Sequence, residues 1–520
     1  MTAAPHSSGP LQRSHYAALL AVIATVLTAY RILVIGHLGI DLYVDEAYYW
    51  GWSKALDWGY FSKPPLIAAL IAASTALFGD GLLAIKLPSL LLYPATAAAL
   101  FVLGERLHSV RAGFWAGLIF MTMPLVSALG LFVSTDAPLL LCWALALIAL
   151  LKAVDAEQGW GAWLAWGAAV GVGLMAKYTM AAFLPSALLL MLLEPAGRRW
   201  LRRPQPWIAL LLALAIFSPN LYWNWIHHFP TFRHTAEITE VGHRGWHPGE
   251  LGEFIGAQWL SLGPLMGILL AWALARSRRI GQDRAGRVLL IFILPLLTLV
   301  SLQALTGRAN GNWAAPIFVA ACVLIPAYFL AERRRWLVAG VALNLVGSLF
   351  VYHWPDVARL ADIPLTAKTD PYKRARGWTR LADGVAPYLA AHPDAILVGE
   401  DREITAHLVY RLHPRDYAAW NPGGRPPIDH YQLVTHLDDQ LGRDILYVGN
   451  VPELPGMEPY YAAIEPLGKV VVPVHTDFRR TVYVFLLKGF KGYKPSAASA
   501  PTIAPAPTAE SSTPPVVSRP

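Results

Sequence analysis

The residues best suited to chemistry lie in one segment, residues 41–66, with the sequence DLYVDEAYYWGWSKALDWGYFSKPPL. It follows the first long apolar segment and places two adjacent acids, Asp45 and Glu46, among many aromatic residues. Adjacent carboxylates at the edge of a hydrocarbon layer are costly unless they bind or catalyse something, and aromatic residues favour the membrane–water interface. We therefore predict that this loop is an active site whose substrate resides in the membrane.

The two acids are expected to face different partners. If the stretch after Asp45 is helical, Asp45 shares a face with Tyr48 and Tyr49, which are candidate sugar- or acceptor-binding residues. Glu46 then points about a quarter-turn away. A carboxylate here could act as general base towards an acceptor hydroxyl or amine. The alternative is that Asp45 only caps the following helix.

A set of cations could bind a phosphate group. Lys63 precedes two prolines and follows Tyr60, so a rigid turn holds a cation near a phenol. Lys177 and Arg233 lie in other loops on the same predicted side and could add positive charge. The alternative for Lys63 is an interfacial lysine that extends its ammonium to water.

Two further segments lie at the outer ends of apolar stretches. FVSTDAPLLL places Asp136 almost inside an apolar run, where it either lines a cavity or, like Ser134, caps a helix. RANGNWAAP supplies Asn312 and Trp313, an amide for sugar hydroxyls and an aromatic face for stacking. An ordinary interfacial cap with an aromatic anchor would explain that segment equally well.

No cofactor is firmly indicated. The histidines of the loop 227–247 match no metal-ligand spacing. A divalent cation stays open, because the acids suit oxygen ligation while Lys63 beside a phosphate could make a metal unnecessary.

The composition is that of a membrane protein, with 55% hydrophobic and 15% charged residues and a mean hydropathy of +0.42. Segments able to cross roughly 30 Å of hydrocarbon are expected at eleven places. They lie near 16–36, 83–104, 112–128, 136–152, 162–176, 179–194, 207–226, 256–275, 287–305, 313–330 and 336–352.

Arginine-rich loops near 106–111, 198–203, 276–287 and 333–335 alternate with arginine-poor loops, which predicts that the N-terminus is cytoplasmic. The first acidic loop and everything after Tyr352 then lie outside. The net charge of +8 is thus a topology signal and does not call for nucleic acid. Cys142 and Cys322 both fall in predicted spans, so no disulfide framework is expected.

After Tyr352 the hydropathy falls, and the pattern predicts a small extracytoplasmic α/β domain over 353–494, following a membrane domain over 1–352. Strands are expected at 395–401, 444–450, 469–475 and 481–490, and a helix at 377–392. Residues 495–520 are rich in Pro, Ala, Ser and Thr and are expected to be disordered.

The motifs DEAYYWGWS, GYFSKPPL, STDAPLL and GNWAAP resemble those of bacterial glycosyltransferase family 39. This group of polyprenyl-phosphate sugar transferases includes the lipid A aminoarabinose transferases and, more distantly, protein O-mannosyltransferases. The resemblance covers roughly residues 10–350. It implies a polytopic α-helical membrane protein with a GT-C fold of about 11–13 spans in the inner (plasma) membrane.

The resemblance also implies a reaction, in which a polyprenyl-phosphate donor gives its sugar to an extracytoplasmic acceptor such as lipid A or another envelope glycan or lipid. By this resemblance Asp45 is the first-loop catalytic acid, Glu46 its neighbour on the acceptor side and Asp136 the second outer acid. One base and a pre-activated donor suggest direct, inverting transfer.

On the donor side, the same resemblance makes Lys63 the lysine that grips the lipid phosphate, with Tyr60 beside it and Arg233 as a weaker match. Some aminoarabinose transferases carry an acid before this lysine, where this chain has Ser62, which argues against an aminosugar donor. The alternatives are a protein O-mannosyltransferase, a non-enzymatic carrier or flippase of lipid-linked sugars, and a membrane scaffold. Charges clustered at the outer face, and not at the midplane, favour an enzyme over a carrier.

Overall fold

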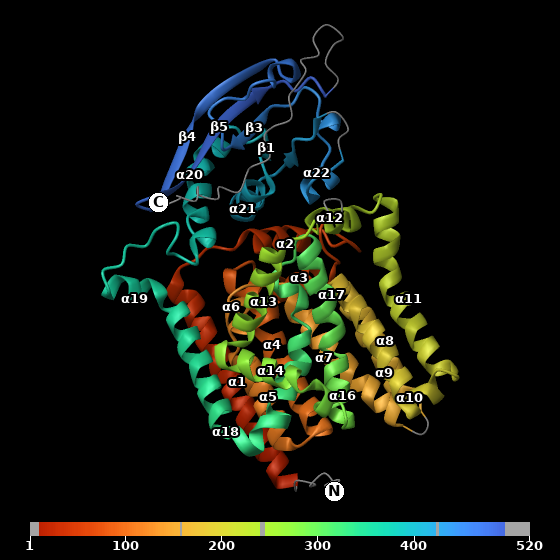
Figure 1. The fold of residues 1–520 in the computed structure, drawn as a ribbon. Helices are drawn as coiled ribbons and strands as arrows, with labels where there is room; N and C mark the ends of the chain where they lie inside the picture. Colours follow the sequence, from red (N-terminus) through yellow and green to blue (C-terminus); the bar gives the residue numbers. More distant parts are fainter. Residues whose placement is uncertain (1–9, 157–158, 240–244, 423–425, 494–520) are drawn as a thin grey trace.

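The computed structural model describes residues 10–156, 159–239, 245–422 and 426–493. A bundle of helices carries a mixed β-sheet at one end (Figure 1). The tail expected at 495–520 lies outside the described residues.

Within the described residues, six helices are long and apolar enough to cross a membrane. They are α1 (Pro10–Leu38), α4 (Leu82–Leu107), α7 (Asp136–Asp155), α11 (Pro204–Ile226), the combined α16 (Arg284–Ile291) and α17 (Leu294–Thr306), and α18 (Ile317–Tyr352). A seventh span is possible if α13 (Pro248–Leu262) and α14 (Pro264–Ala275) are counted together.

Several expected spans differ in the structure. The segment 256–275 is bent by 112° because Gly263, with φ of +100°, and Pro264 end one helix and start another. The expected spans 313–330 and 336–352 fall in α18, where two helices meet at a kink at Arg333 with no loop between them. The segment 112–128 is divided into α5 (Val110–Thr122) and α6 (Pro124–Leu129), since a proline starts the second helix.

Shorter apolar helices complete the bundle: α3 (Leu66–Phe78), which the eleven expected segments did not include, α8 (Gly161–Ala176), and η1 (Tyr178–Ala182) with α9 (Phe183–Leu193). Glycines let neighbouring helices approach closely. A Cβ at Gly113 would lie 2.3 Å from the carbonyl oxygen of Phe101, and one at Gly167 would lie 2.2 Å from that of Ala209. Such close backbone packing is typical of helices in membranes.

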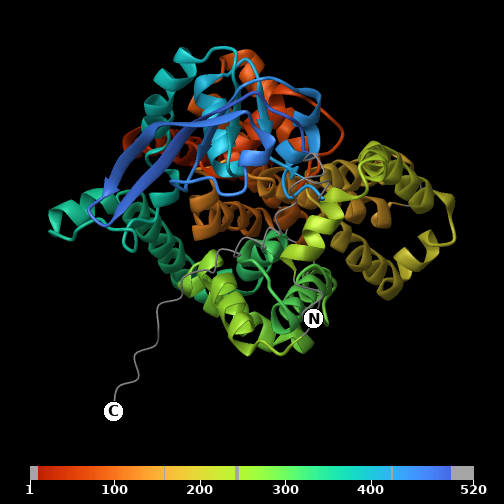
Figure 2. The ribbon, with the colours of Figure 1, turned by 90° about the horizontal axis from the view of Figure 1, so that it is seen from above.

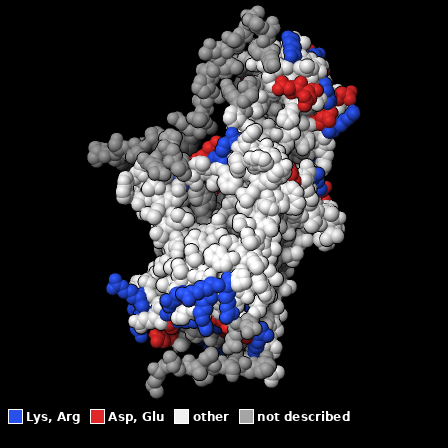
Figure 3. Space-filling model, turned by 90° about the vertical axis from the view of Figure 1, so that its right-hand side faces the viewer, with Lys and Arg blue, Asp and Glu red and all other residues white. Residues whose placement is uncertain are grey.

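One face of the molecule has a broad zone almost free of charged residues, and Lys and Arg gather at the end opposite the sheet (Figure 3). α10 (Pro195–Trp200), with Arg198 and Arg199, and the arginines that follow it lie at this end (Figure 1). An apolar belt with a basic rim is the surface expected of a chain that crosses a bilayer.

The outer domain contains a five-stranded sheet in the order β2-β1-β3-β5-β4. The strands β2 (Tyr417–Ala419), β1 (Ile396–Gly399) and β3 (Ile445–Gly449) are parallel, whereas β5 (Phe478–Lys488) pairs antiparallel with both β3 and β4 (Ala463–His475). The four expected strands and the helix, α20 (Trp378–Ala391), are confirmed. The short β2 was not expected. Helices α19 (Trp354–Leu360), α21 (Arg402–Leu412), α12 (Pro230–Ile238) and α22 (His430–Val434) also lie at this end of the molecule (Figure 1).

The helix α2 (Val44–Lys54) lies between the bundle and this domain (Figure 1). Its buried aromatic side chains, among them Tyr48 and Trp52, pack in one cluster with residues of α3, α4, α21 and α22. Asp41, just before α2, caps α20 by accepting hydrogen bonds from the Trp378 N–H at 2.8 Å and the Thr379 hydroxyl at 2.5 Å. Seen from above, the sheet lies over the N-terminal helices and leaves the helices around α14 uncovered (Figure 2). The first loop is thus enclosed between two domains.

Candidate active site

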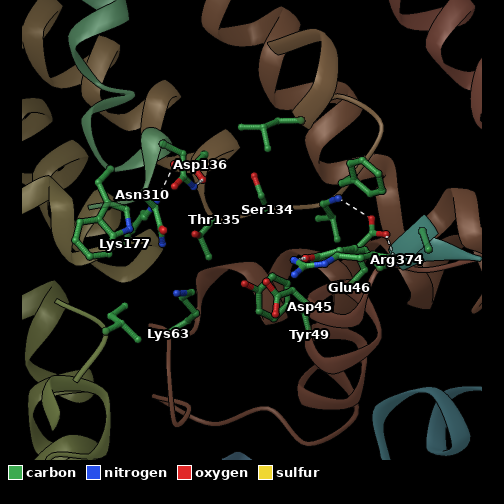
Figure 4. Close-up of a pocket in the computed structure, with 18 of the residues that line it drawn as sticks. Asp45, Glu46, Tyr49, Lys63, Ser134, Thr135, Asp136, Lys177, Asn310 and Arg374 are labelled. Carbon is green, nitrogen blue, oxygen red and sulfur yellow. Dashed lines mark hydrogen bonds and ion pairs between the residues drawn. The ribbon is translucent and has the colours of Figure 1, made fainter. Parts of the chain in front are cut away.

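A cavity of about 500 Å³ opens beside α2, a volume in the range of small-molecule sites. Its lining comes from the first loop, the start of α7, the residues before η1, η2 (Gly311–Ala314) and the segment before α20 (Figure 4). The cavity is lined by most of the site residues predicted from the sequence: Asp45, Glu46, Tyr49, Lys63, Asp136, Lys177, Asn312 and Trp313. Segments more than 300 residues apart in the chain, such as those of Tyr43 and Arg374, therefore meet around one space.

Asp45 lies in the first turn of α2 and presents a carboxylate that is 41% exposed. Its Oδ1 accepts a hydrogen bond from Nη1 of Arg402 at 3.1 Å, and the same guanidinium lies 5.4 Å from the centre of the Tyr48 ring. Arg402 belongs to α21 of the outer domain and was not indicated by the sequence. An exposed carboxylate held in orientation by one cation can still receive a proton, as a general base must.

Glu46 faces the other way, as expected from the helical geometry, but it is buried and bound. Both of its carboxylate oxygens lie 2.6 Å from Nζ of Lys86, and backbone N–H groups of Val133 and Tyr43 donate to it at 2.7 and 2.8 Å. Only 1% of the Glu46 surface is exposed. These contacts hold α2 against α4, and the catalytic role expected of Glu46 stays a prediction.

Replacing Lys86 by Met should destabilise the protein by about 3–5 kcal/mol, because it leaves the Glu46 carboxylate buried without its cation. Thermal unfolding of the purified protein in detergent measures the effect. The double variant Glu46→Gln/Lys86→Met removes both charges and should recover most of the lost stability. A Lys86→Met protein as stable as wild type would show that this pair does not hold α2 in place.

Lys63 extends into the cavity without an anionic partner. Among the described residues no hydrogen bond or ion pair is formed by its Nζ, although the side chain is largely buried. Burial lowers the pKa of Lys63, and the positive charge of Lys177 lowers it further, while Asp45 and Asp136 oppose the shift. A buried ammonium without a counter-ion is costly, so this position favours the binding of an anion.

Asp136 ties together three parts of the wall. It is the first residue of α7, is 2% exposed, and accepts hydrogen bonds from Lys177 Nζ at 2.8 Å and Asn312 Nδ2 at 2.9 Å. The capping alternative was wrong for this helix, since Thr135 is the N-cap and no side chain caps it. Asp136 thus holds Lys177 and the Asn312 amide at the cavity wall, and Figure 4 shows Asp136 beside Lys177.

Three of the expected residues do not line the cavity. Tyr48 is 1% exposed, and its hydroxyl accepts a hydrogen bond from the His430 N–H of the outer domain. Tyr60 stacks on Trp52 with ring centres 4.6 Å apart and donates to the Trp52 carbonyl at 3.1 Å. Arg233 is exposed on α12. Both rings are buried in the aromatic cluster that joins α2 to the outer domain.

Arg374 lines the cavity and, like Arg402, was not indicated by the sequence. It lies between α19 and α20, and its Nη1 donates to the Tyr43 hydroxyl at 3.0 Å. Figure 4 shows it on the Asp45 side of the cavity, across from Lys63. The only signal in the sequence was the basic run KRAR at 373–376, which had no motif around it.

The cavity acids do not form a shared metal-ligand set. Asp45 is bound to Arg402, Glu46 to Lys86 and Asp136 to Lys177. Each carboxylate already has a cationic partner, and the divalent cation left open by the sequence has no group of ligands here among the described residues.

Known proteins have similar sequences. The sequence model of the dolichyl-phosphate-mannose-protein mannosyltransferase family matches residues 62–223. The lipid A galacturonosyltransferase RgtD of Rhizobium johnstonii is 30% identical over 431 residues, covering 82% of this chain and 90% of that protein. The chain belongs to the GT-C glycosyltransferases of the lipid A aminoarabinose transferase type.

More distant members agree with this assignment to the GT-C glycosyltransferases. An undecaprenyl phosphate-alpha-4-amino-4-deoxy-L-arabinose arabinosyl transferase of Pseudomonas fluorescens is 27% identical over 317 residues, covering 56% of this chain and 54% of that protein. The crystal structure of ArnT from Cupriavidus metallidurans bound to undecaprenyl phosphate has a TM-score of 0.63 at 16% identity, covering 91% of this chain and 98% of that one.

As a GT-C glycosyltransferase, the protein is an enzyme that uses a polyprenyl-phosphate sugar. It is also a multi-pass protein of the inner membrane. The likeness to ArnT supports the fold alone, and the cavity residues are assigned from their own geometry.

Proposed function

We propose that the protein transfers a sugar from a polyprenyl-phosphate donor to lipid A, or to another envelope lipid or glycan, at the extracytoplasmic face. The observation that carries the proposal is the unpaired ammonium of Lys63, which shares a cavity with the exposed carboxylate of Asp45. A phosphate leaving group needs the cation, and an acceptor hydroxyl needs the base.

In the proposed mechanism the donor phosphate lies against Lys63, with the charge of Lys177 nearby. Asp45 removes the proton from the acceptor hydroxyl as its oxygen bonds to the anomeric carbon. The bond from that carbon to the phosphate oxygen breaks, and the electron pair leaves with the polyprenyl phosphate. A single displacement inverts the anomeric configuration. Asn312 and Trp313 are placed to contact the sugar.

The orientation in the membrane is also a proposal. Lys and Arg gather at the end of the bundle opposite the sheet (Figure 3). Positive charge is retained on the cytoplasmic side, so the N-terminus lies inside, and the cavity and outer domain lie outside. A donor lipid can then reach the cavity from the outer leaflet.

We further propose that the donor sugar carries a carboxylate. Arg374 gives the cavity a cation on the side away from Lys63, so the two can bind separate anions (Figure 4). A guanidinium matches a carboxylate in bidentate geometry. RgtD is named a galacturonosyltransferase, and Ser62 stands where some aminoarabinose transferases have an acid. An acidic sugar fits this distribution of charge better than an aminosugar.

Replacing Arg374 by Gln should reduce kcat/KM for a uronosyl donor by about 10- to 100-fold, the equivalent of one charge-assisted hydrogen bond. Transfer from a neutral hexosyl donor should change much less. The measurement uses purified protein, radiolabelled polyprenyl-phosphate sugars of both kinds and a membrane lipid extract. Arg374→Lys keeps the positive charge but loses the bidentate geometry of the guanidinium, so its kcat/KM for the uronosyl donor should lie between those of wild type and Arg374→Gln. Equal losses with both donors would count against an acidic sugar and assign Arg374 a general role.

A further inference from the structure

We propose that His37, His353 and Asp356 form a binding site for a first-row transition metal ion, with Zn²⁺ as the best match. Among the described residues, these three make up the one group of potential ligands whose donor atoms all lie within 4.8 Å of one another. None of them lines the catalytic cavity. They belong to a different part of the surface, next to a second hollow of about 600 Å³.

The geometry is close to that of a zinc site. Nε2 of His37 lies 2.6 Å from Oδ2 of Asp356, and Nδ1 of His353 lies 3.4 Å from the same oxygen. Tetrahedral zinc, with bonds of about 2.0–2.1 Å, holds its ligand atoms about 3.3 Å apart. The shorter of the two distances must widen by less than about 1 Å. The His37 side chain is 52% exposed, so it has room to move.

A further contact favours a built site over a chance ion pair. The hydroxyl of Tyr30 lies 2.6 Å from Nε2 of His353. In the tautomer with the proton on Nε2, the hydroxyl accepts that proton and Nδ1 keeps a free lone pair on the side of Asp356 and His37. Metal-bound histidines are usually fixed in this way by a partner on the second ring nitrogen. A simple pair between His37 and Asp356 would need neither His353 nor Tyr30.

The neighbouring charges leave the ligand atoms available. Arg359 contacts the other oxygen, Oδ1, of Asp356 at 3.4 Å. Two imidazoles and one carboxylate, with remaining positions open to water, are a donor set suited to Zn²⁺ and poorly suited to Mg²⁺ or Ca²⁺. Arg359 lowers the local affinity for any cation, and its removal should therefore not weaken binding.

The ion would join chain segments that lead to the active site. His37 lies in the last turn of α1, after which the chain runs through Gly39 and Asp41 to α2 with Asp45. His353 follows α18 and Asp356 lies in α19, which leads towards the segment that contains Arg374. A metal here would fix the membrane domain to the start of the outer domain. Its role is structural, and the proposal does not depend on the sugar that is transferred.

Zn²⁺ titration of the full-length protein tests the site. The detergent-purified protein is stripped with EDTA, freed of chelator and titrated with Zn²⁺ by calorimetry, with thermal unfolding as a second readout. We expect one saturable site per chain and a higher unfolding temperature with Zn²⁺. His37→Gln/His353→Gln should bind at least about 100-fold more weakly, and Tyr30→Phe about 10-fold more weakly.

Arg359→Gln is the matched control, since it alters the same cluster without removing a ligand, and it should bind Zn²⁺ as tightly as wild type or more tightly. No saturable binding in wild type, or unchanged binding in the double variant, would overturn the proposal. If the double variant does not fold, Tyr30→Phe decides: affinity equal to that of wild type would contradict the site. These readouts are independent of sugar transfer, so they separate this proposal from the proposed function.

Discussion

Asp45→Asn should lower the rate of sugar transfer by about 10²- to 10⁴-fold while leaving donor binding nearly unchanged. Asparagine keeps the shape of the side chain, and its oxygen can still accept from Arg402, but it cannot take the acceptor proton. Lys63 is untouched, so the donor phosphate keeps its cation. Single-turnover rates with a radiolabelled donor, together with donor binding measured without acceptor, separate the two effects.

Asp383→Asn is a suitable control for Asp45→Asn. Asp383 forms an exposed ion pair with Arg411 in the outer domain and does not line the cavity. The Asp383→Asn protein should transfer sugar at the wild-type rate. Full single-turnover activity in Asp45→Asn would refute the assignment of Asp45 as base. A product with the donor's own anomeric configuration would refute direct displacement.

Lys63→Gln should reduce kcat/KM by about 10²- to 10³-fold, as the loss of a group that stabilises leaving-group charge does. In contrast to Asp45→Asn, this substitution should also weaken donor binding, because the phosphate loses its cation. Binding titrations of the polyprenyl phosphate with each variant measure this directly. Lys63→Arg keeps the charge and should retain part of the affinity.

The lowered pKa of Lys63 adds a pH test. The ammonium binds the phosphate only while it is protonated, and burial together with Lys177 makes it lose its proton at a lower pH than an ordinary lysine. Donor affinity should therefore fall as pH rises through this lowered pKa, and Lys63→Arg should not show that fall. Lys54→Gln, which removes an exposed lysine on α2 that pairs with Asp80, is the control. Wild-type donor affinity in Lys63→Gln would place the phosphate elsewhere.

The sequence identified the residues near the cavity whose position follows from local pattern. Asp45, Lys63 and Asp136 each stand at the edge of an apolar segment, where a charged residue is exceptional. Arg402 and Arg374 carry no such signal, because arginine is ordinary in a water-exposed domain. Arg402 reaches Asp45, and Arg374 reaches the cavity, only through the packing of α21 and of the segment before α20 on the first loop. Tyr48 and Tyr60 were predicted as site residues but are buried away from the cavity, because their motif does not reveal which way an aromatic ring points.

The same distinction applies to the fold. The runs AILVGED, DILYVGN and TVYVFLLKGF predicted β1, β3 and β5 because β-branched and aromatic residues bounded by turn residues are typical of strands. The bundle was harder to predict. Three arginines at 333–335 were expected in a loop between two spans, and the two helices of α18 instead meet there at a kink with no loop between them. Length and hydropathy do not show whether a break becomes a loop, a kink or a bend such as that at Gly263.

The most direct test of the central claim is a transfer assay in proteoliposomes that contain the purified protein, a lipid A acceptor and a polyprenyl-phosphate sugar with the label in its sugar. Our account predicts that the label moves to the acceptor with wild type, that free polyprenyl phosphate appears in equal amount, and that Asp45→Asn produces neither. If the intact labelled donor crosses the bilayer and no sugar is released, the protein carries lipid-linked sugars and the proposed transfer is contradicted.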